Sequence, residues 1–223
     1  MLQRKQLGLT YLDSAPSQPE NAPMLVMLHG YGSNEKDLIQ LAPLLGSSLH
    51  FISVRAPLTL DFGMFGWFPL EFTANGITGD QEAAEAARAQ LTRFITELIT
   101  SYKPKGNKVF LMGFSQGTVM SYAIAFIKPD LLHGVVACSG QLPEQLFPDT
   151  AVEPLLKQLP FLVMHGVYDE VLPIEKGRSA NTWFREKVLD LTYREYPVAH
   201  EISPAALHLT ARWLKERIAK LPG

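Results

Sequence analysis

The residues best suited to chemistry lie in a short glycine–serine motif near the middle of the chain. Residues 113–117 read GFSQG, a G-x-S-x-G motif, between the apolar run VFLM at 109–112 and a helical pattern at 116–127. A serine between a strand and a helix stands on a sharp turn that exposes its hydroxyl, and glycines remove the Cβ atoms that would clash there. The motif predicts Ser115 as a nucleophile. The alternative is a glycine-rich turn with an incidental serine.

A serine hydroxyl is a weak nucleophile at neutral pH and needs a base, usually histidine. In the α/β-hydrolase arrangement, which places a serine on such a turn, the chain order is serine, acid, histidine. The chain has six histidines: His29, His50, His133, His165, His200 and His208. Two precede the serine, the third follows it too closely, the fourth precedes the acid and the last falls in a predicted helix. His200, in a loop after the last predicted strand, is the expected base.

The candidate acid is an aspartate that follows another apolar run. Asp169 comes after FLVM at 161–164, in a turn that contains Gly166. Its alternative role is that of a turn-forming residue that caps the next helix. Neighbouring Glu170 is the local rival and ranks below it. As the acid, Asp169 would hold His200 in one tautomer and stabilise the imidazolium that forms during catalysis.

A second glycine-rich turn can supply hydrogen-bond donors to a developing oxyanion. Residues 29–32 read HGYG and follow the apolar run MLVML at 24–28, the position from which such hydrolases donate one backbone N–H. We expect the N–H groups of Tyr31 and Gln116 to form the oxyanion hole. The alternative is a simple turn between a strand and a helix. The side chain of His29 is expected to be structural.

Short apolar runs alternate with helical patterns along the whole chain. Strands are predicted at 24–28, 51–54, 109–112, 135–138, 161–164 and 191–196, with an N-terminal edge strand at 7–12. Helices are predicted at 80–102, capped by Asp80, and at 116–127, 174–188 and 204–219. This alternation predicts one α/β domain over 1–223, with a mainly parallel sheet, helices on both faces and no large cap domain. Two long loops, at 57–79 and 141–159, are expected to be functional.

Composition narrows the classes of protein. The chain has 223 residues, 47% of them hydrophobic, and a net charge of −2, so a broad nucleic-acid footprint is not expected. Its single cysteine, Cys138, allows no internal disulfide and no cysteine metal cage. No stretch approaches the about 20 apolar residues that span a bilayer, and the N-terminus lacks the apolar core of a signal peptide. We expect a cytoplasmic protein without a metal or cofactor.

The first long loop is rich in large apolar side chains. Residues 58–72 read LTLDFGMFGWFPLEF, and its glycines disfavour a regular helix. We expect some of these residues to line an apolar groove beside Ser115: Phe62, Met64, Phe65, Trp67 and Phe68. The alternative is that they pack into the core. Exposed aromatic residues at this density also favour a homodimer.

Several segments together resemble the phospholipase/carboxylesterase family of serine hydrolases. They are, in order, LHGYGSNEKD, RAP, FGMFGWFPL, GFSQG, CSG, HGVYDEVLP and YPVAHEIS, and the similarity runs from about residue 24 to 213. The family includes bacterial carboxylesterases and acyl-protein thioesterases. The resemblance implies an ester or thioester substrate, an α/β-hydrolase fold and no cofactor. It also implies Ser115, Asp169 and His200 as the triad, with Tyr31 and Gln116 at the oxyanion.

Two positions depart from the family pattern. Ala199 stands before the catalytic histidine, where members often have glycine, and Tyr31 stands where leucine is common. The first could shift the histidine loop and the second could narrow the pocket. The expected reaction is hydrolysis of carboxylic esters with small or medium acyl chains. The alternatives are a lysophospholipase, an acyl-protein thioesterase and a non-catalytic binding protein with the same fold.

Overall fold

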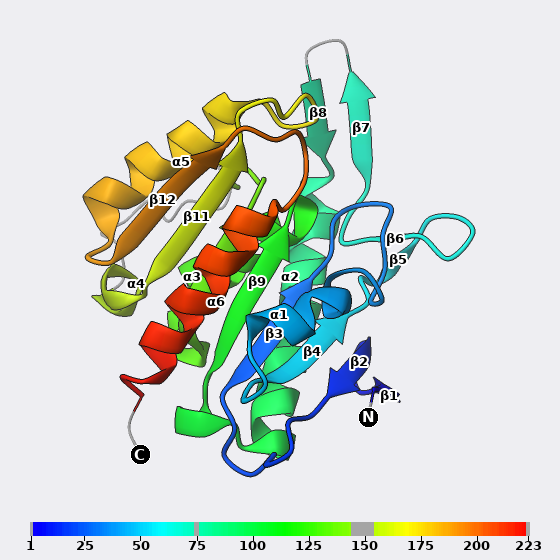
Figure 1. The fold of residues 1–223 in the computed structure, drawn as a ribbon. Coiled ribbons are helices and arrows are strands. Elements are labelled where there is room, and N and C mark those ends of the chain that lie inside the picture. The colour runs from blue at the N-terminus through cyan, green and yellow to red at the C-terminus, as the bar shows by residue number, and fades with distance from the viewer. Residues whose placement is uncertain (1, 74–75, 144–153, 222–223) are drawn as a thin grey trace.

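The computed structural model describes residues 2–73, 76–143 and 154–221 (Figure 1). Its centre is an eight-stranded sheet with the order β1-β2-β4-β3-β9-β10-β11-β12. The strands are β1 (Gln3–Gln6), β2 (Thr10–Ser14), β3 (Met24–Leu28), β4 (His50–Val54), β9 (Val109–Phe114), β10 (Leu132–Cys138), β11 (Phe161–Gly166) and β12 (Leu191–Tyr196). The six neighbouring strands β4, β3, β9, β10, β11 and β12 are parallel. Strand β2 is antiparallel to both β4 and β1. The predicted α/β-hydrolase fold, with its mainly parallel sheet, is confirmed.

The central strands are apolar on both sides because both faces of the sheet are covered. In β9, Val109 and Leu111 belong to one core cluster, and Phe110 and Met112 belong to the other. A strand buried on both faces has an unbroken apolar sequence instead of an alternating one. This burial explains why the runs in the sequence located the parallel strands.

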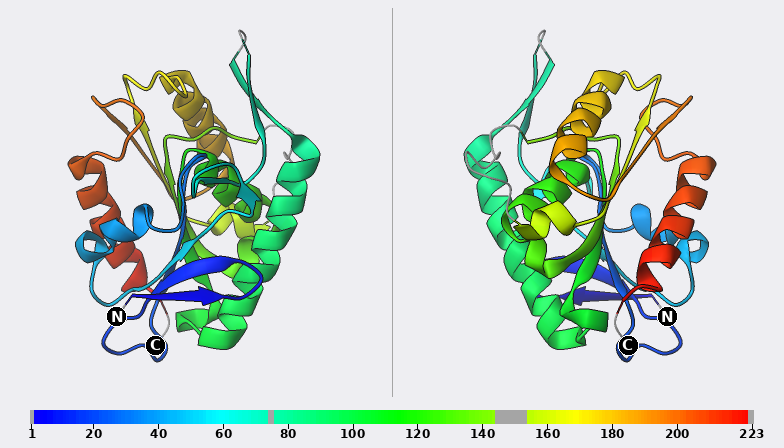
Figure 2. Two further views of the ribbon diagram at one scale, coloured as in Figure 1. Left: turned by 90° about the vertical axis from the view of Figure 1, so that its right-hand side faces the viewer. Right: turned by 90° about the vertical axis from the view of Figure 1, so that its left-hand side faces the viewer.

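Helices form a layer on each face, as the sheet seen edge-on in Figure 2 shows. One layer holds α2 (Gln81–Tyr102), α3 (Gln116–Ile127), α4 (Pro154–Gln158) and α5 (Ile174–Lys187), and the other holds α1 (Ala42–Leu45) and α6 (Pro204–Ile218). The predicted cap of α2 is confirmed, since Asp80 Oδ1 accepts the Ala83 N–H at 2.9 Å. None of the described helices is long and apolar enough to cross a membrane.

The N-terminal edge differs from the prediction. The sequence suggested one strand at 7–12, but the chain reverses there, so that β1 ends at Gln6 and β2 begins at Thr10. Gly8 lies in this reversal, and its N–H donates to Glu97 Oε2 of α2 at 3.0 Å. The reversal is held by contact with a helix about 90 residues away in sequence, which local sequence patterns do not report.

The first long loop contains two small antiparallel ribbons. Strand β5 (Leu58–Thr59) pairs with β6 (Phe65–Gly66), and β7 (Leu70–Thr73) pairs with β8 (Gly76–Gly79). The β7–β8 ribbon rises away from the sheet beyond the carboxyl ends of the parallel strands (Figure 1). The described residues form no separate cap domain. Much of the second predicted loop, at 144–153, lies outside the described residues.

Candidate active site

The G-x-S-x-G motif forms the sharp turn that its sequence predicted. Ser115 lies between β9 and α3 with φ 53° and ψ −117°, a backbone conformation that is costly for any residue with a Cβ. The turn is held because the Ser115 N–H donates to Cys138 O at 3.0 Å and Ser115 O accepts the Thr118 N–H at 2.9 Å. A Cβ at Gly117 would lie 1.9 Å from Leu28 O, so only glycine fits there. The strain and its supports place Ser115 at the start of α3.

The predicted acid and base are in contact. His200 Nδ1 lies 2.7 Å from Asp169 Oδ2. Because an ionised carboxylate can only accept, Nδ1 carries the proton and Nε2 keeps its lone pair. The side chain of Asp169 is fully buried, and its Oδ1 accepts the N–H groups of Val171 and Leu172 at 3.0 and 2.8 Å. The acid is thus fixed by its own loop, and the tautomer of His200 is that of a general base.

The loops that carry the acid and the base pack directly on each other. A Cβ at Gly166 would lie 2.2 Å from Ala199 O and 2.5 Å from Val198 O, so the absence of a side chain lets the two backbones meet. The Tyr168 N–H donates to Val198 O at 3.0 Å and ties the loops together. On the other side, the Phe114 ring lies 4.8 Å from the His200 ring, centroid to centroid. Gly166 therefore controls the distance between the acid loop and the base loop.

The second glycine-rich turn, at 29–32, lies against the turn of Ser115. A Cβ at Gly30 would lie 3.3 Å from Ser115 Cβ, so this loop and the serine turn are in contact. Beyond it, the Gly32 N–H donates to Phe65 O at 2.9 Å. The Tyr31 ring lies over Gly66, where an added Cβ would come within 2.8 Å of it. Tyr31 is therefore packed beside the serine and not extended into solvent.

These residues open onto one cavity with a volume of about 540 Å³, which is in the range of small-molecule sites. Ser115, His200, Tyr31 and Gln116 all lie in its wall. The other lining residues are Phe68, Leu70, Ile77, Thr78, Gly79, Asp80, Gln81, Ala84, Val119, Met120, Ala123, Gln141, Leu142, Pro143, Val171, Leu172, Lys176 and Ser179. Its wall combines aliphatic side chains with polar ones, so it offers apolar contacts beside the serine and the histidine.

The sequence and the fold can be compared with known proteins at this point. A family model described as Phospholipase/Carboxylesterase matches residues 14–218. The chain belongs to this family. The prediction from its sequence motifs is thereby confirmed.

Individual members of the family are distant in sequence. A protein of Oryza sativa subsp. japonica named a probable inactive carboxylesterase is 24% identical over 219 residues, covering 92% of this chain and 89% of its own. Acyl-protein thioesterase 1 of Yarrowia lipolytica is also 24% identical, covering 91% of this chain and 95% of its own. The solved structure of the Bacillus cereus carboxylesterase aligns with a TM-score of 0.80 at 22% identity and covers 94% of each chain. These family members include an enzyme active on acyl-proteins by name and one named as inactive.

The two departures from the family pattern are accommodated without disturbing the site. Ala199 is exposed, while its carbonyl packs on Gly166 and accepts the Glu201 N–H at 2.9 Å. The loop thus keeps His200 on Asp169 despite the larger residue. Tyr31 fits because the facing residue, Gly66, has no side chain. Its ring lines the cavity together with Ser115 and His200.

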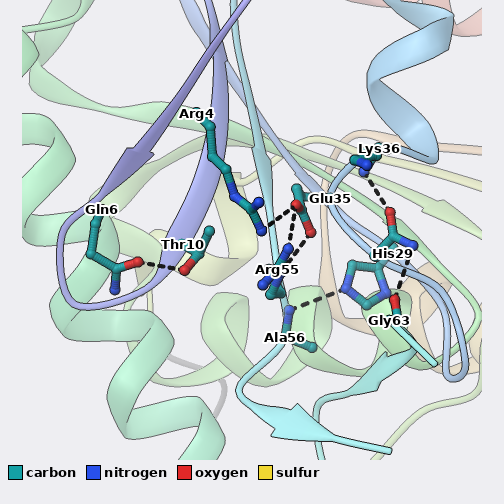
Figure 3. Close-up of polar contacts among 10 residues, drawn as sticks. Arg4, Gln6, Thr10, His29, Glu35, Lys36, Arg55, Ala56 and Gly63 are labelled. Carbon is teal, nitrogen blue, oxygen red and sulfur yellow. Dashed lines mark hydrogen bonds and ion pairs between the residues drawn. The ribbon is translucent and has the colours of Figure 1, made fainter. Parts of the chain in front are cut away.

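An ion pair and a histidine hold residues 55–57 (RAP) against residues 29–35 (HGYGSNE), the segment that contains the second glycine-rich turn (Figure 3). Glu35 is fully buried, and Arg55 Nε and Nη2 donate to its two oxygens at 2.7 and 2.6 Å. The next residue, Ala56, donates its N–H to His29 Nε2 at 3.1 Å. Burial lowers the pKa of His29, so the ring is neutral and can accept this hydrogen bond. His29 is structural, as the sequence suggested.

Sequence reasoning missed one role of Gln116. Its side-chain Oε1 accepts the Trp67 N–H at 2.7 Å, and its Nε2 donates to Phe68 O at 2.8 Å. The residue that follows Ser115 therefore also holds the segment from which Phe68 lines the cavity. No local pattern in the sequence reports this contact, because the partners are about 50 residues apart. The sequence does carry a signal for a different feature, the face of α3 that lines the cavity. Its residues are spaced three or four apart, as one face of a helix requires: Gln116, Val119, Met120 and Ala123.

The aromatic loop is placed differently from the expectation for four of its five residues. Phe68 lines the cavity, but Phe62, Met64, Phe65 and Trp67 are not among the lining residues. Trp67 is buried in the core and its Nε1 donates to His29 O at 3.0 Å, which was the alternative reading. Phe65 covers the Arg55 guanidinium at 4.2 Å, and Phe62 is 94% exposed at the tip of the β5–β6 ribbon. These four side chains therefore do not form the wall of the cavity.

The described residues contain no group of three or more histidine, cysteine, aspartate or glutamate side chains that could hold a metal ion.

Proposed function

We propose that this protein is a serine hydrolase that cleaves carboxylic esters of small or medium acyl chains through an acyl-enzyme. The observation that supports this most is the 2.7 Å contact between His200 Nδ1 and Asp169 Oδ2 in a cavity that Ser115 also lines. Asp169 fixes the histidine as a base, and the strained turn presents the serine. Membership of a family of ester hydrolases supports the same chemistry.

In the first step, Ser115 Oγ attacks the ester carbonyl carbon while His200 Nε2 takes the hydroxyl proton. The resulting oxyanion accepts hydrogen bonds from the N–H groups of Tyr31 and Gln116. His200 then gives its proton to the departing alcohol oxygen as the carbon–oxygen bond breaks. In the second step, His200 removes a proton from water, which attacks the acyl-enzyme, and Ser115 leaves with that proton as a free hydroxyl.

The shape of the cavity supports an apolar acyl chain as the recognised group. Val119, Met120 and Ala123 extend from the nucleophile along α3, and Leu70 and Ile77 face them from the β7–β8 ribbon in the same cavity. The position of Ala123 is about 10 Å along the helix axis from Gln116, which gives room for a medium-length chain. A thioester would enter by the same route, and one relative is named an acyl-protein thioesterase.

The test is hydrolysis of p-nitrophenyl esters from acetyl to palmitoyl by the wild type and by Ser115→Ala. We expect a maximum between acetyl and decanoyl, and loss of turnover in the variant with an unchanged melting temperature. Ser179→Ala is the matched control, because this serine lines the same cavity away from the triad. A maximum at palmitoyl would support the lysophospholipase or thioesterase alternative. A wild type without turnover on any ester, and without labelling of Ser115 by a fluorophosphonate, would refute the proposal.

A further inference from the structure

A second histidine lies beside the acid of the triad. His165, in β11, is 2% exposed, and its Nε2 is 2.7 Å from Leu172 O and 3.5 Å from Asp169 Oδ2. Two histidine nitrogens therefore lie near the same carboxylate oxygen, His200 Nδ1 at hydrogen-bond distance and His165 Nε2 farther away. The mechanism derived above makes no use of His165.

The hydrogen bonds determine the protonation of this ring. Leu172 O can only accept, so His165 Nε2 carries a proton. Nδ1 has no hydrogen-bond partner among the described residues and lies against Gly177 of α5, where an added Cβ would be 2.8 Å from it. A doubly protonated ring would bury an unpaired N–H donor at this contact, which is costly. The N–H on Nε2 is therefore directed at the acid loop.

This N–H closes the loop that carries the acid. Leu172 is held on both sides, since its N–H donates to Asp169 Oδ1 at 2.8 Å and its carbonyl accepts from His165 at 2.7 Å. Rotation of the Asp169 carboxylate would break the first of these bonds, and movement of the loop would break the second. Val171 and Leu172 also line the cavity, so the same bond positions part of its wall.

We propose that His165 is a positioning residue for the acid of the triad, holding the Asp169 carboxylate in the orientation that His200 requires. This proposal rests on the proposed function. Its Nε2–H fixes the loop through Leu172 O and places a positive dipole end 3.5 Å from Asp169 Oδ2, the oxygen that also contacts His200. Gly177 contributes to this position, because a residue with a Cβ would clash with the His165 ring at this contact of α5.

Two isosteric variants separate positioning from packing. The amide nitrogen of glutamine can take the place of Nε2, whereas that of asparagine lies near Nδ1 and cannot reach Leu172 O. We expect His165→Asn to lower kcat about 100-fold with little change in KM, since a displacement of about 1 Å in a catalytic group has that effect. We expect His165→Gln to recover most of the wild-type kcat. Both variants lose the ring, and asparagine is one methylene shorter than glutamine, so the free energy of unfolding of each variant is measured beside kcat. A role in packing alone would lower kcat and the free energy of unfolding together.

A second measurement does not depend on turnover. The His200 Nδ1–H in its short bond to Asp169 should give a low-field proton resonance in the wild-type protein. We expect this resonance to persist in His165→Gln and to shift or vanish in His165→Asn. An asparagine variant with wild-type kcat and an unchanged resonance would overturn the proposal, as would equal losses in both variants. If the wild type cleaves no ester, the proposed function fails while the resonance still decides the role of His165.

Discussion

Two aspartate–histidine pairs with the same short distance lie in the part of the chain that the structure describes. His200 Nδ1 is 2.7 Å from Asp169 beyond the carboxyl ends of β11 and β12, and His50 Nε2 is 2.7 Å from Asp13 where β4 begins. The His200 side chain is 18% exposed and lines the cavity with Ser115, whereas that of His50 is 4% exposed and lies outside the cavity lining. A short aspartate–histidine bond is therefore not by itself a catalytic signature. Its place relative to a nucleophile decides its role.

The two carboxylates also differ in how their charge is balanced. Asp13 accepts from the Lys5 ammonium at 2.6 Å and from the Tyr102 hydroxyl at 2.7 Å in addition to His50. In the described part of the chain, Asp169 pairs with no lysine or arginine, and its other donors are the backbone N–H groups of its own loop. Because no lysine or arginine neutralises its charge, such a carboxylate can stabilise the imidazolium that forms when its histidine takes up a proton. The comparison thus distinguishes the proposed catalytic acid, Asp169, from the structural Asp13 by its partners.

The largest expected effect tests the catalytic pair. Asp169→Asn should lower kcat about 10⁴-fold, because the amide favours the wrong histidine tautomer. Turnover of a p-nitrophenyl ester measures this effect. The matched control is Glu170→Gln, an exposed neighbour that should change kcat little. A larger loss in the Glu170 variant than in the Asp169 variant would move the acid to the neighbouring position.

The next effect tests the structural pair. Asp13→Asn should lower the free energy of unfolding by about 3 kcal/mol, since removing one partner of a buried ion pair leaves the others uncompensated. Urea unfolding of the wild type and the variant measures the difference. Ester turnover at a temperature where both are folded should be the same. A variant that lost activity but kept its stability would reverse the roles assigned to the two pairs.

The pH dependence of this difference is a smaller effect with a defined sign. Burial opposes the ionisation of Asp13, but hydrogen bonds from His50, Lys5 and Tyr102 outweigh it and hold the pKa of Asp13 well below its usual range. Its stabilising effect is therefore complete above the unfolded pKa of about 4 and is lost as the pH falls below it. The gap in unfolding free energy between the wild type and Asp13→Asn should narrow between about pH 5 and pH 2. Urea titrations at several pH values measure it, and a gap that widens on acidification would contradict the assignment.

The smallest effect concerns the cavity beside the catalytic pair. Ala123→Leu should lower kcat/KM for decanoyl esters about tenfold, a loss of roughly 1.4 kcal/mol, because the larger side chain fills space that the acyl chain would occupy. The acetyl ester is the internal control, since its chain is too short to extend about 10 Å along α3. An equal loss for both esters would indicate general damage to α3 and would place the acyl chain elsewhere.

Features that depend on neighbouring residues could be predicted from the sequence, and features that depend on distant residues could not. The parallel strands and the four long helices were visible as apolar runs and helical periods, because a strand buried on both faces and a helix buried on one leave repeating patterns. The strand-to-helix context of Ser115 and the chain order that selects His200 were visible for the same reason. The hairpin at the N-terminal edge was not, since Gly8 is held by Glu97 from a distant helix.

The sequence by itself determined the order of the strands and helices along the chain, the turn at Ser115 and the candidates for its acid and base. These features depend on residues close together in the chain, whose apolar periods and glycines act over a few positions. Only the tertiary structure decided that Phe68 lines the cavity while Trp67 enters the core, and that Gln116 holds the segment containing both. It also brought His200 and Ser115 to one cavity and left His50 outside the lining of that cavity. These outcomes depend on how distant elements pack, and a contact between distant residues leaves no period in the sequence.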